Sequence, residues 1–140
     1  MPNSTGQEIL QEAGQPLVQM HDVDIMNGDT LILSNVNITI NKGEFVYLLG
    51  KVGSGKSSII KTLIAELPLR KGAAQVAGFN LWKIKRSRIP YLRRKIGVVF
   101  QDFRLLQDRT VYENVAFAQR VVEVPPAEIK RKVPRMLSMV

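Results

Sequence analysis

Residues 50–57 read Gly50-Lys51-Val52-Gly53-Ser54-Gly55-Lys56-Ser57, which is the phosphate-binding P-loop pattern G-x-x-x-x-G-K-[ST]. The preceding residues, 45–49, form a short unbroken apolar run, typical of a strand buried on both faces. After the loop, apolar residues fall on one helical face as far as Pro68: Ile59, Ile60, Leu63, Ile64 and Leu67. The order of strand, glycine loop and helix is the context in which this pattern binds a nucleotide.

The residue types of the loop suit phosphate chemistry. Glycines let backbone N–H groups turn inward around phosphate oxygens, and a helix N-terminus adds partial positive charge. Lys56 is expected to reach the β- and γ-phosphates, and the Ser57 hydroxyl to hold Mg²⁺. A chance match in a flexible loop is the competing interpretation, and the correct flanks count against it. The predicted nucleotide-binding set is Gly50, Lys51, Val52, Gly53, Ser54, Gly55, Lys56, Ser57 and Ser58.

Several strands are predicted around the loop. Residues 1–15 are polar without a sustained period, which favours a flexible tail. A strand begins near Leu17 and closes at the turn 27–29. Residues 31–40 follow, and their second half alternates as a half-buried antiparallel strand does. Residues 73–77 and 96–100 are the remaining predicted strands, and the second is expected to lie in the core.

Two helices are predicted after residue 109. Residues 110–113 form a T-x-x-E capping box, so a helix starts there and runs to Ala118 or beyond. The second starts at Pro125-Pro126, and Pro134 should kink or restart it. Its apolar stripe continues to the last residue and consists of Ile129, Val133, Leu137 and Val140. The chain is therefore interpreted as cut off.

Composition limits the class of protein. A chain of 140 residues has room for one domain, and the absence of cysteine excludes disulfides and thiolate metal sites. Apolar runs of about five residues are too short to cross a membrane. Residues 1–6 lack the features of a signal peptide, so a cytoplasmic location is expected.

Charge is distributed unevenly along the chain. Residues 1–66 hold four Lys/Arg against seven Asp/Glu, a net charge of −3, whereas residues 67–140 hold sixteen against five, a net charge of +11. Seven basic residues lie within 83–95, which raises the question of nucleic acid or an anionic membrane. No RNA-binding motif accompanies them, so a solvated face is favoured and no specific nucleic acid is expected.

The P-loop, the strands before it and the run Val98-Val99-Phe100-Gln101-Asp102 together resemble the ATP-binding subunits of ABC transporters. The resemblance covers nearly all of 16–140, with closest similarity to a cell-division branch in 96–106 and 108–115. It implies an α/β fold, a P-loop NTPase of the ABC type, with an antiparallel β-subdomain before the P-loop strand. It also implies that 16–140 is the N-terminal part of one ATP-binding domain.

The resemblance implies functional roles. ATP and Mg²⁺ would be the cofactors, Lys56 and Gln101 would serve catalysis, and Ser57 and Gln101 would contact the metal. The glutamine would also couple hydrolysis to an integral membrane partner, which would hold the protein at the inner face of the plasma membrane. Intact members of the family form head-to-tail homodimers.

Several features of the family do not occur in this sequence. The L-S-G-G-Q segment, the Walker B strand ending in Asp-Glu and the switch histidine are missing, and the single histidine, His21, precedes the P-loop. Met26 and Asn27 stand where the family usually places an aromatic residue against adenine. The 140 residues alone are therefore expected to be inactive in ATP hydrolysis.

Three alternatives to the cell-division assignment stay open. Another ABC importer or a lipoprotein-release ATPase would share the P-loop and the glutamine. A P-loop kinase is disfavoured by the antiparallel strands before the P-loop and by Gln101. A nucleic-acid-binding module would rely on residues 83–95, and a steep dependence of binding on salt would reveal it.

Overall fold

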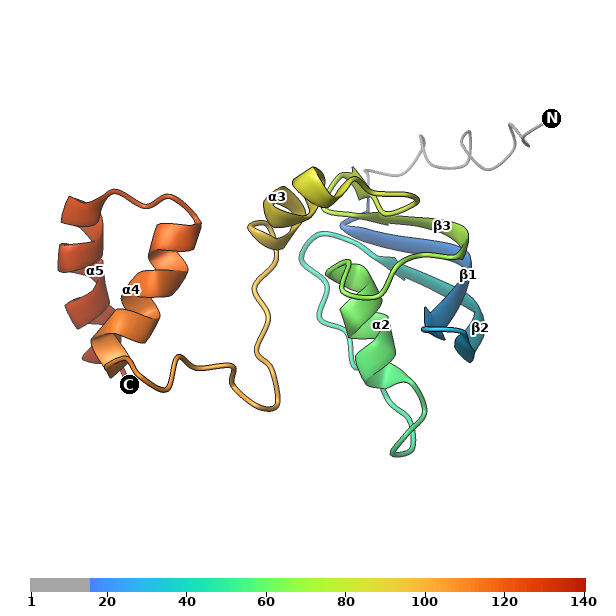
Figure 1. Ribbon diagram of the computed structural model, residues 1–140, viewed down its shortest axis with the longest axis horizontal. Coiled ribbons are helices and arrows are strands. Elements are labelled where there is room, and N and C mark those ends of the chain that lie inside the picture. Colours follow the sequence, from blue (N-terminus) through green and yellow to red (C-terminus); the bar gives the residue numbers. More distant parts are fainter. Residues whose placement is uncertain (1–15) are drawn as a thin grey trace. The chain divides into compact units, whose positions relative to one another are not determined.

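The computed structural model describes residues 16–140 (Figure 1). The tail predicted for residues 1–15 lies outside the described residues. The chain divides into two compact units, Met1–Ile96 and Gly97–Val140, and each is described by itself. Within the described residues, no helix has the length and apolar character needed to cross a bilayer.

The first unit contains a four-stranded antiparallel sheet in the order β2-β1-β3-β4. Its strands are β1 (Val18–Asn27), β2 (Thr30–Ile40), β3 (Lys71–Val76) and β4 (Phe79–Asn80). The predicted turn joins β1 to β2, with Gly28 in the left-handed region at φ 59°. Alternation along β2 is confirmed, because Val36, Ile38 and Ile40 are half-buried and the residues between them are exposed.

The central strand β1 is irregular where it meets β3. The register shifts between His21 and Asp24, and Asp22 has a positive φ of 50°. Opposite this bulge lies Gly72, with φ 83°. A Cβ at Gly72 would lie 2.6 Å from the carbonyl oxygen of His21 and would overlap the backbone of Asp22. Only glycine therefore allows β3 to approach β1 this closely.

The P-loop helix is shorter than predicted. Helix α2 spans Lys56–Leu63 and ends in a Schellman motif, with Glu66 N–H donating to the Lys61 carbonyl at 2.8 Å. Ala65 takes the left-handed position at φ 53°, which glycine usually fills, so no stop signal is visible in the sequence before Pro68. Ile60 is exposed rather than buried, and Thr62 faces the core instead. The Thr62 hydroxyl donates to the Ser58 carbonyl at 2.9 Å, which satisfies it.

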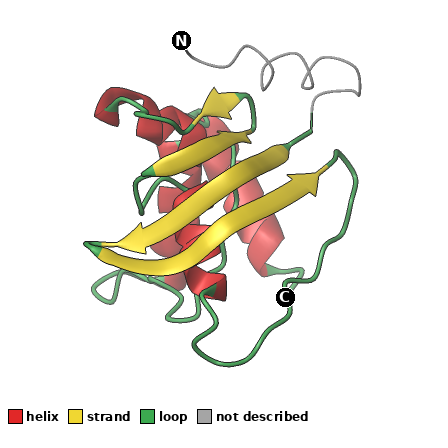
Figure 2. Ribbon diagram, turned by 90° about the vertical axis from the view of Figure 1, so that its right-hand side faces the viewer, coloured by secondary structure: helices red, strands yellow, loops and turns green. Residues whose placement is uncertain are grey.

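Helix α2 covers one face of the sheet (Figure 2). The core beneath it is one apolar cluster: Met20, Val23, Ile25, Ile59, Leu69, Ala74, Val76, Leu81 and Leu92. Leu92 comes from α3 (Ile89–Arg93), which follows the 3-10 turn η1 (Arg86–Arg88). The Arg93 guanidinium donates to the carbonyls of Ile64 at 3.0 Å and Ala65 at 3.4 Å, so α3 satisfies the C-terminal end of α2.

Two predicted core strands do not form. Residues 45–49 and 96–100 belong to no strand of the described chain, and Phe45, Leu49 and Val99 are more than four-fifths exposed. The prediction of buried strands was wrong for this structure. A strand is stable when its N–H and C=O groups meet those of neighbouring strands, and the four strands of the sheet pair only with one another.

The second unit is a pair of helices, α4 (Val111–Val121) and α5 (Pro126–Leu137). Ala116 of α4 is buried against Ile129 and Val133 of α5, with Leu137 beside them. The predicted helix starts are confirmed, including the capping box at Thr110. Pro134 lies inside α5 on its exposed side without restarting the helix, and Val140 is fully exposed beyond the end of the predicted stripe.

Candidate functional site

The P-loop presents backbone donors that have no acceptor. The N–H groups of Gly53, Gly55, Lys56 and Ser57 make no hydrogen bond within residues 16–140. Lys56 and Ser57 are the first residues of α2, so their N–H groups lie at its positive end. Unpaired donors at a helix N-terminus form an anion-binding concavity.

Glycines give the loop its shape. Gly53 and Gly55 have φ values of 79° and 87°, in the left-handed region. A Cβ on Gly53 would meet nothing within 4 Å, so this position faces open space. A Cβ on Gly55 would lie 2.9 Å from the side chain of Leu33, which places the loop directly against β2. A Cβ on Gly50 would lie 2.6 Å from the Ser54 hydroxyl oxygen.

The Lys56 side chain folds back over the loop. Its ammonium group donates to the carbonyl oxygens of Gly50 and Lys51, each at 2.7 Å, and lies 3.3 Å from the Ser54 hydroxyl. The structure therefore brings Gly50, Lys51, Ser54 and Lys56 together. The Lys56 ammonium group is thus held by carbonyl oxygens of the loop, which an incoming anion can replace.

Ser57 fits a metal only as one ligand among several. Its side chain is exposed and makes no hydrogen bond within the described residues. No group of three or more His, Asp or Glu side chains capable of holding a metal occurs in 16–140. Mg²⁺ commonly takes one or two protein ligands and completes its shell with phosphate oxygens and water. The donor set therefore fits Mg²⁺ bound together with a nucleotide.

Gln101 belongs to the second unit. It begins a turn, residues 101–104, in which Phe103 and Arg104 have φ values of 57° and 48°. The Arg104 guanidinium lies 3.7 Å from the centroid of the Phe100 ring and 3.8 Å from the Asp102 carboxylate. The Gln101 side chain is exposed and has no hydrogen-bond partner within 16–140, so it remains available to a ligand.

The family model described as "ABC transporter" matches residues 33–140. The chain belongs to the ABC transporter family. The predicted family is thereby confirmed, and with it the fold: the N-terminal part of an ABC-type P-loop domain with an antiparallel sheet.

Two relatives are similar to this ABC transporter chain over most of its length. The cell division ATP-binding protein FtsE of Streptococcus pneumoniae is 44% identical over 125 residues, covering 89% of this chain and 54% of the relative. The spermidine/putrescine import ATP-binding protein PotA of Pasteurella multocida is 34% identical over 126 residues, covering 90% and 33%. The chain thus spans about half the length of the FtsE relative it matches.

A solved structure of an ABC cassette has the same fold. An ATP-binding cassette determined as a dimer in a post-hydrolysis state, bound to ADP and Pi, superposes with a TM-score of 0.76. The two chains are 28% identical, and the match covers 87% of this ABC transporter chain and 56% of the other.

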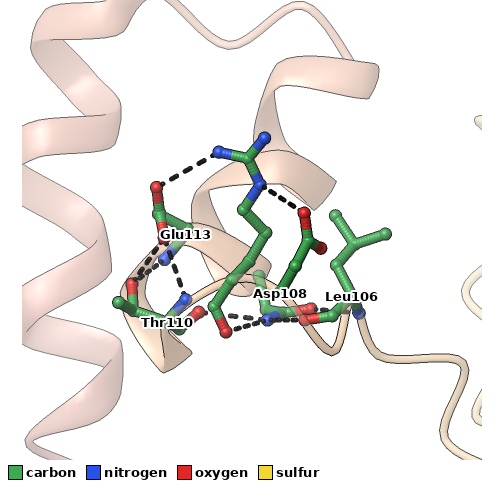
Figure 3. Close-up of polar contacts among 6 residues, drawn as sticks. Leu106, Asp108, Thr110 and Glu113 are labelled. Atoms are coloured by element: carbon green, nitrogen blue, oxygen red, sulfur yellow. Dashed lines mark hydrogen bonds and ion pairs between the residues drawn. The ribbon is translucent and has the colours of Figure 1, made fainter.

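Sequence reasoning missed the residue that shapes the segment after Gln101. In this ABC transporter chain, the Asn114 side chain accepts from Leu106 N–H at 2.8 Å and donates to the carbonyls of Leu106, Arg109 and Thr110 at 3.1, 3.3 and 3.0 Å. These bonds fold residues 106–110 onto the start of α4 (Figure 3). An asparagine one residue after the capping-box glutamate was the available signal.

The capping box beside Asn114 is fully formed. Glu113 accepts from Thr110 N–H at 2.9 Å, and Thr110 Oγ1 accepts from Glu113 N–H at 3.2 Å (Figure 3). Arg109 lies 3.5 Å from Asp108 and 3.6 Å from Glu113. The hydrogen bonds from Thr110 N–H and Oγ1–H, with smaller help from Arg109, hold the pKa of the Glu113 carboxyl below its ordinary value.

Proposed function

We propose that this chain is the nucleotide-binding part of an FtsE-like ATPase subunit, and that residues 16–140 form the N-terminal part of its ATP-binding domain. The observation that carries the proposal is the P-loop, where four N–H groups have no acceptor within residues 16–140 and the Lys56 ammonium is held by two carbonyls of the same loop. These are the donors that the phosphates of ATP require.

Each loop residue has a proposed part in binding ATP. The backbone from Gly50 to Ser58 surrounds the phosphates, and Lys56 exchanges its carbonyl acceptors for the β- and γ-phosphate oxygens. Ser57 would supply a hydroxyl ligand to Mg²⁺, and the bound metal would contribute positive charge beside the transferred phosphoryl group.

Gln101 is proposed to act in hydrolysis and coupling. Its exposed side chain, without a protein partner, suits contact with Mg²⁺ and with the attacking water. The resemblance of 98–102 to the ABC family supports a role for Gln101 in coupling to an FtsX-type integral membrane subunit. In the intact protein we expect a head-to-tail homodimer, held at the cytoplasmic face of the plasma membrane by that subunit and serving cell division.

An importer ATPase is the second candidate. The PotA relative covers as much of this chain as the FtsE relative does, but its identity is 34% against 44%. The difference favours the FtsE-like assignment. Complementation of a strain depleted of its own FtsE by the full-length protein would separate the two.

Substitution of Lys56 tests the nucleotide site. Lys56→Ala removes the ammonium group that is bonded to the carbonyls of Gly50 and Lys51 and that is proposed to bind the β- and γ-phosphates. Charge-assisted hydrogen bonds contribute about 1.5–3 kcal/mol, so the affinity for a fluorescent ATP analogue should fall about tenfold or more. The matched control is Lys42→Ala, which removes the same charge from an exposed turn residue outside the loop. Equal affinities for wild type and Lys56→Ala, both folded, would contradict the proposal.

A further inference from the structure

A strongly basic segment follows the edge strand β4, and nucleotide binding gives it no role. No acidic residue occurs between Glu66 and Asp102, whereas nine Lys/Arg residues do. Some of the nine have structural partners, since Lys71 lies 3.2 Å from Asp24 and Arg93 donates to the end of α2. In the described chain, none of the four basic residues of 83–88 pairs with a carboxylate or caps a helix, although Lys83 and Arg88 lie near aromatic rings.

The segment is fixed to the core by its apolar residues. Leu81 and Leu92 are buried, and Ile84 is half-buried against the same cluster. Every charged and aromatic residue between them is exposed. We name these residues the basic surface: Trp82, Lys83, Lys85, Arg86, Arg88 and Tyr91.

The cations of the basic surface are not neutralised by the protein. Within residues 16–140, Lys83, Lys85, Arg86 and Arg88 form no ion pair with Asp or Glu. Lys83 and Arg86 line a pocket of about 600 Å³, together with the apolar residues Leu67, Leu69 and Leu81. The one carboxylate lining this pocket, that of Glu66, lies 4.0 Å from Lys61.

The basic surface also carries two large aromatic side chains in contact with water. Trp82 is 43% exposed and Tyr91 is 54% exposed. Trp and Tyr are the residues that gather at membrane–water interfaces, where an apolar ring and a polar group are both solvated. Lys and Arg beside them are attracted to anionic headgroups over about a Debye length.

From this combination we propose that the basic surface binds the headgroups of anionic phospholipids at a bilayer surface. Lys83, Lys85, Arg86 and Arg88 contact the headgroup phosphates, and Trp82 and Tyr91 enter the interfacial layer. The proposal does not depend on nucleotide binding, because the P-loop contributes none of these residues.

The aromatic contacts favour lipid over single-stranded nucleic acid. Lys83 lies over the Trp82 ring at 5.6 Å, Arg94 over Tyr91 at 5.4 Å and Arg88 over Phe79 at 5.4 Å. Each of these rings therefore already has a cation near one face, which leaves at most one face for stacking on a base. Insertion of ring edges between headgroups leaves these contacts intact.

A fluorescence titration tests the proposal directly, because Trp82 is the only tryptophan in the chain. The 140-residue chain is titrated with vesicles of phosphatidylcholine, with and without phosphatidylglycerol. We expect binding only to the anionic vesicles, with a blue shift of the Trp82 emission and a loss of binding as salt is raised. Binding to both kinds of vesicle alike, or binding without the blue shift, would overturn the proposal.

Two charge variants locate the site. The variant Lys83→Gln/Lys85→Gln/Arg86→Gln/Arg88→Gln should lower vesicle partitioning about a hundredfold or more, since each basic residue near an anionic surface contributes roughly fivefold. The matched control Lys130→Gln/Arg131→Gln/Lys132→Gln/Arg135→Gln removes the same charge from α5. Its vesicle partitioning should fall far less. Equal losses would show that net charge, and not this surface, causes the binding.

Three further measurements complete the test. One distinguishes lost charge from misfolding, and the other two distinguish lipid from free phosphate and from nucleic acid. Arg86→Lys/Arg88→Lys keeps the charge and should keep vesicle binding, which also guards against loss through misfolding. Inorganic phosphate at the same phosphate concentration should neither shift the Trp82 emission nor displace the vesicles. A short DNA duplex that bound more tightly than the anionic vesicles would overturn the assignment to lipid.

Discussion

Gly53 and Gly55 have similar backbone conformations but different surroundings. Substitutions at the two positions therefore distinguish the cost of backbone strain from the cost of a steric clash. A non-glycine residue in the left-handed region costs about 1–2 kcal/mol. Both positions carry this cost, but only a Cβ at Gly55 would lie 2.9 Å from Leu33. We expect Gly53→Ala to lower the free energy of unfolding by about 1–2 kcal/mol, and Gly55→Ala by about 1–3 kcal/mol more. Urea unfolding without nucleotide measures the difference, and equal losses would refute this account of the loop.

Gln101 should affect turnover more than nucleotide affinity. Its side chain is exposed and without a partner in the described chain, so Gln101→Ala removes no structural contact. In the full-length protein with its membrane partner, we expect ATP affinity within a few-fold of wild type and a lower partner-stimulated turnover. Unchanged turnover would leave Gln101 as a polar residue of the turn 101–104 and nothing more.

The start of α4 should be sensitive to acid through one carboxylate. Hydrogen bonds from Thr110 lower the pKa of Glu113 in the folded chain. A carboxyl group with a lowered folded pKa stabilises the fold above its unfolded pKa, about 4.3 for Glu, and that stability is lost as the pH falls through the folded pKa.

Glu113→Gln tests this acid sensitivity. Glutamine can accept the same hydrogen bond in a capping box but does not titrate. The pKa values of Asp24, Glu44 and Glu128 are also lowered, by hydrogen bonds chiefly from Asn35 and Lys71, from Asn41 and from Lys132, so the variant isolates one carboxylate among four. We expect circular dichroism to show a smaller loss of helix in Glu113→Gln below pH about 4. Superimposable acid profiles would rule out the contribution of this carboxylate.

Elements that depend on neighbouring residues were predictable from the sequence, and elements that depend on distant ones were not. The β1–β2 turn at Gly28 and the capping box at Thr110 involve residues within four positions of each other. The end of α2 was missed because Ala65 occupies a position typical of glycine, and the Arg93 side chain that satisfies it lies 28–29 residues away. The P-loop was recognised because its backbone geometry follows from its own glycines.

The two strands that were predicted at 45–49 and 96–100 but do not form show the same limit of prediction for buried elements. Residues 45–49 have the composition of a buried strand, but burial requires partner strands that composition does not reveal. In the described chain the side chains of Phe45 and Tyr47 are exposed and contact each other edge to face at 5.0 Å. Exposed apolar runs of this kind promote aggregation, so we expect the purified 140-residue chain to be poorly soluble.

The whole chain should bind nucleotide weakly at best and should not hydrolyse it. The P-loop is present, whereas the 140 residues contain no L-S-G-G-Q segment, no Walker B strand and no switch histidine. Steady-state phosphate release by the purified chain is the direct assay. Turnover near 1 s⁻¹ or above, the lower end for phosphoryl-transfer enzymes, that disappeared in Lys56→Ala would contradict this expectation. A catalytic carboxylate would then have to be sought among Asp102, Asp108 and Glu113.

The position of β1 between β2 and β3 implies an order of folding. β1 meets β2 across a two-residue turn, and hairpins of this kind form in roughly 1–10 μs. Its other edge pairs Val18 with Val76, a sequence separation of 58 positions from 18 to 76, so closing that edge carries a larger entropic cost. During synthesis, one edge of β1 must wait until β3 leaves the ribosome. The P-loop and α2 lie within the segment that the β1–β3 pairing closes, so the phosphate-binding residues sit in the part of the chain that must be looped out before this edge can form.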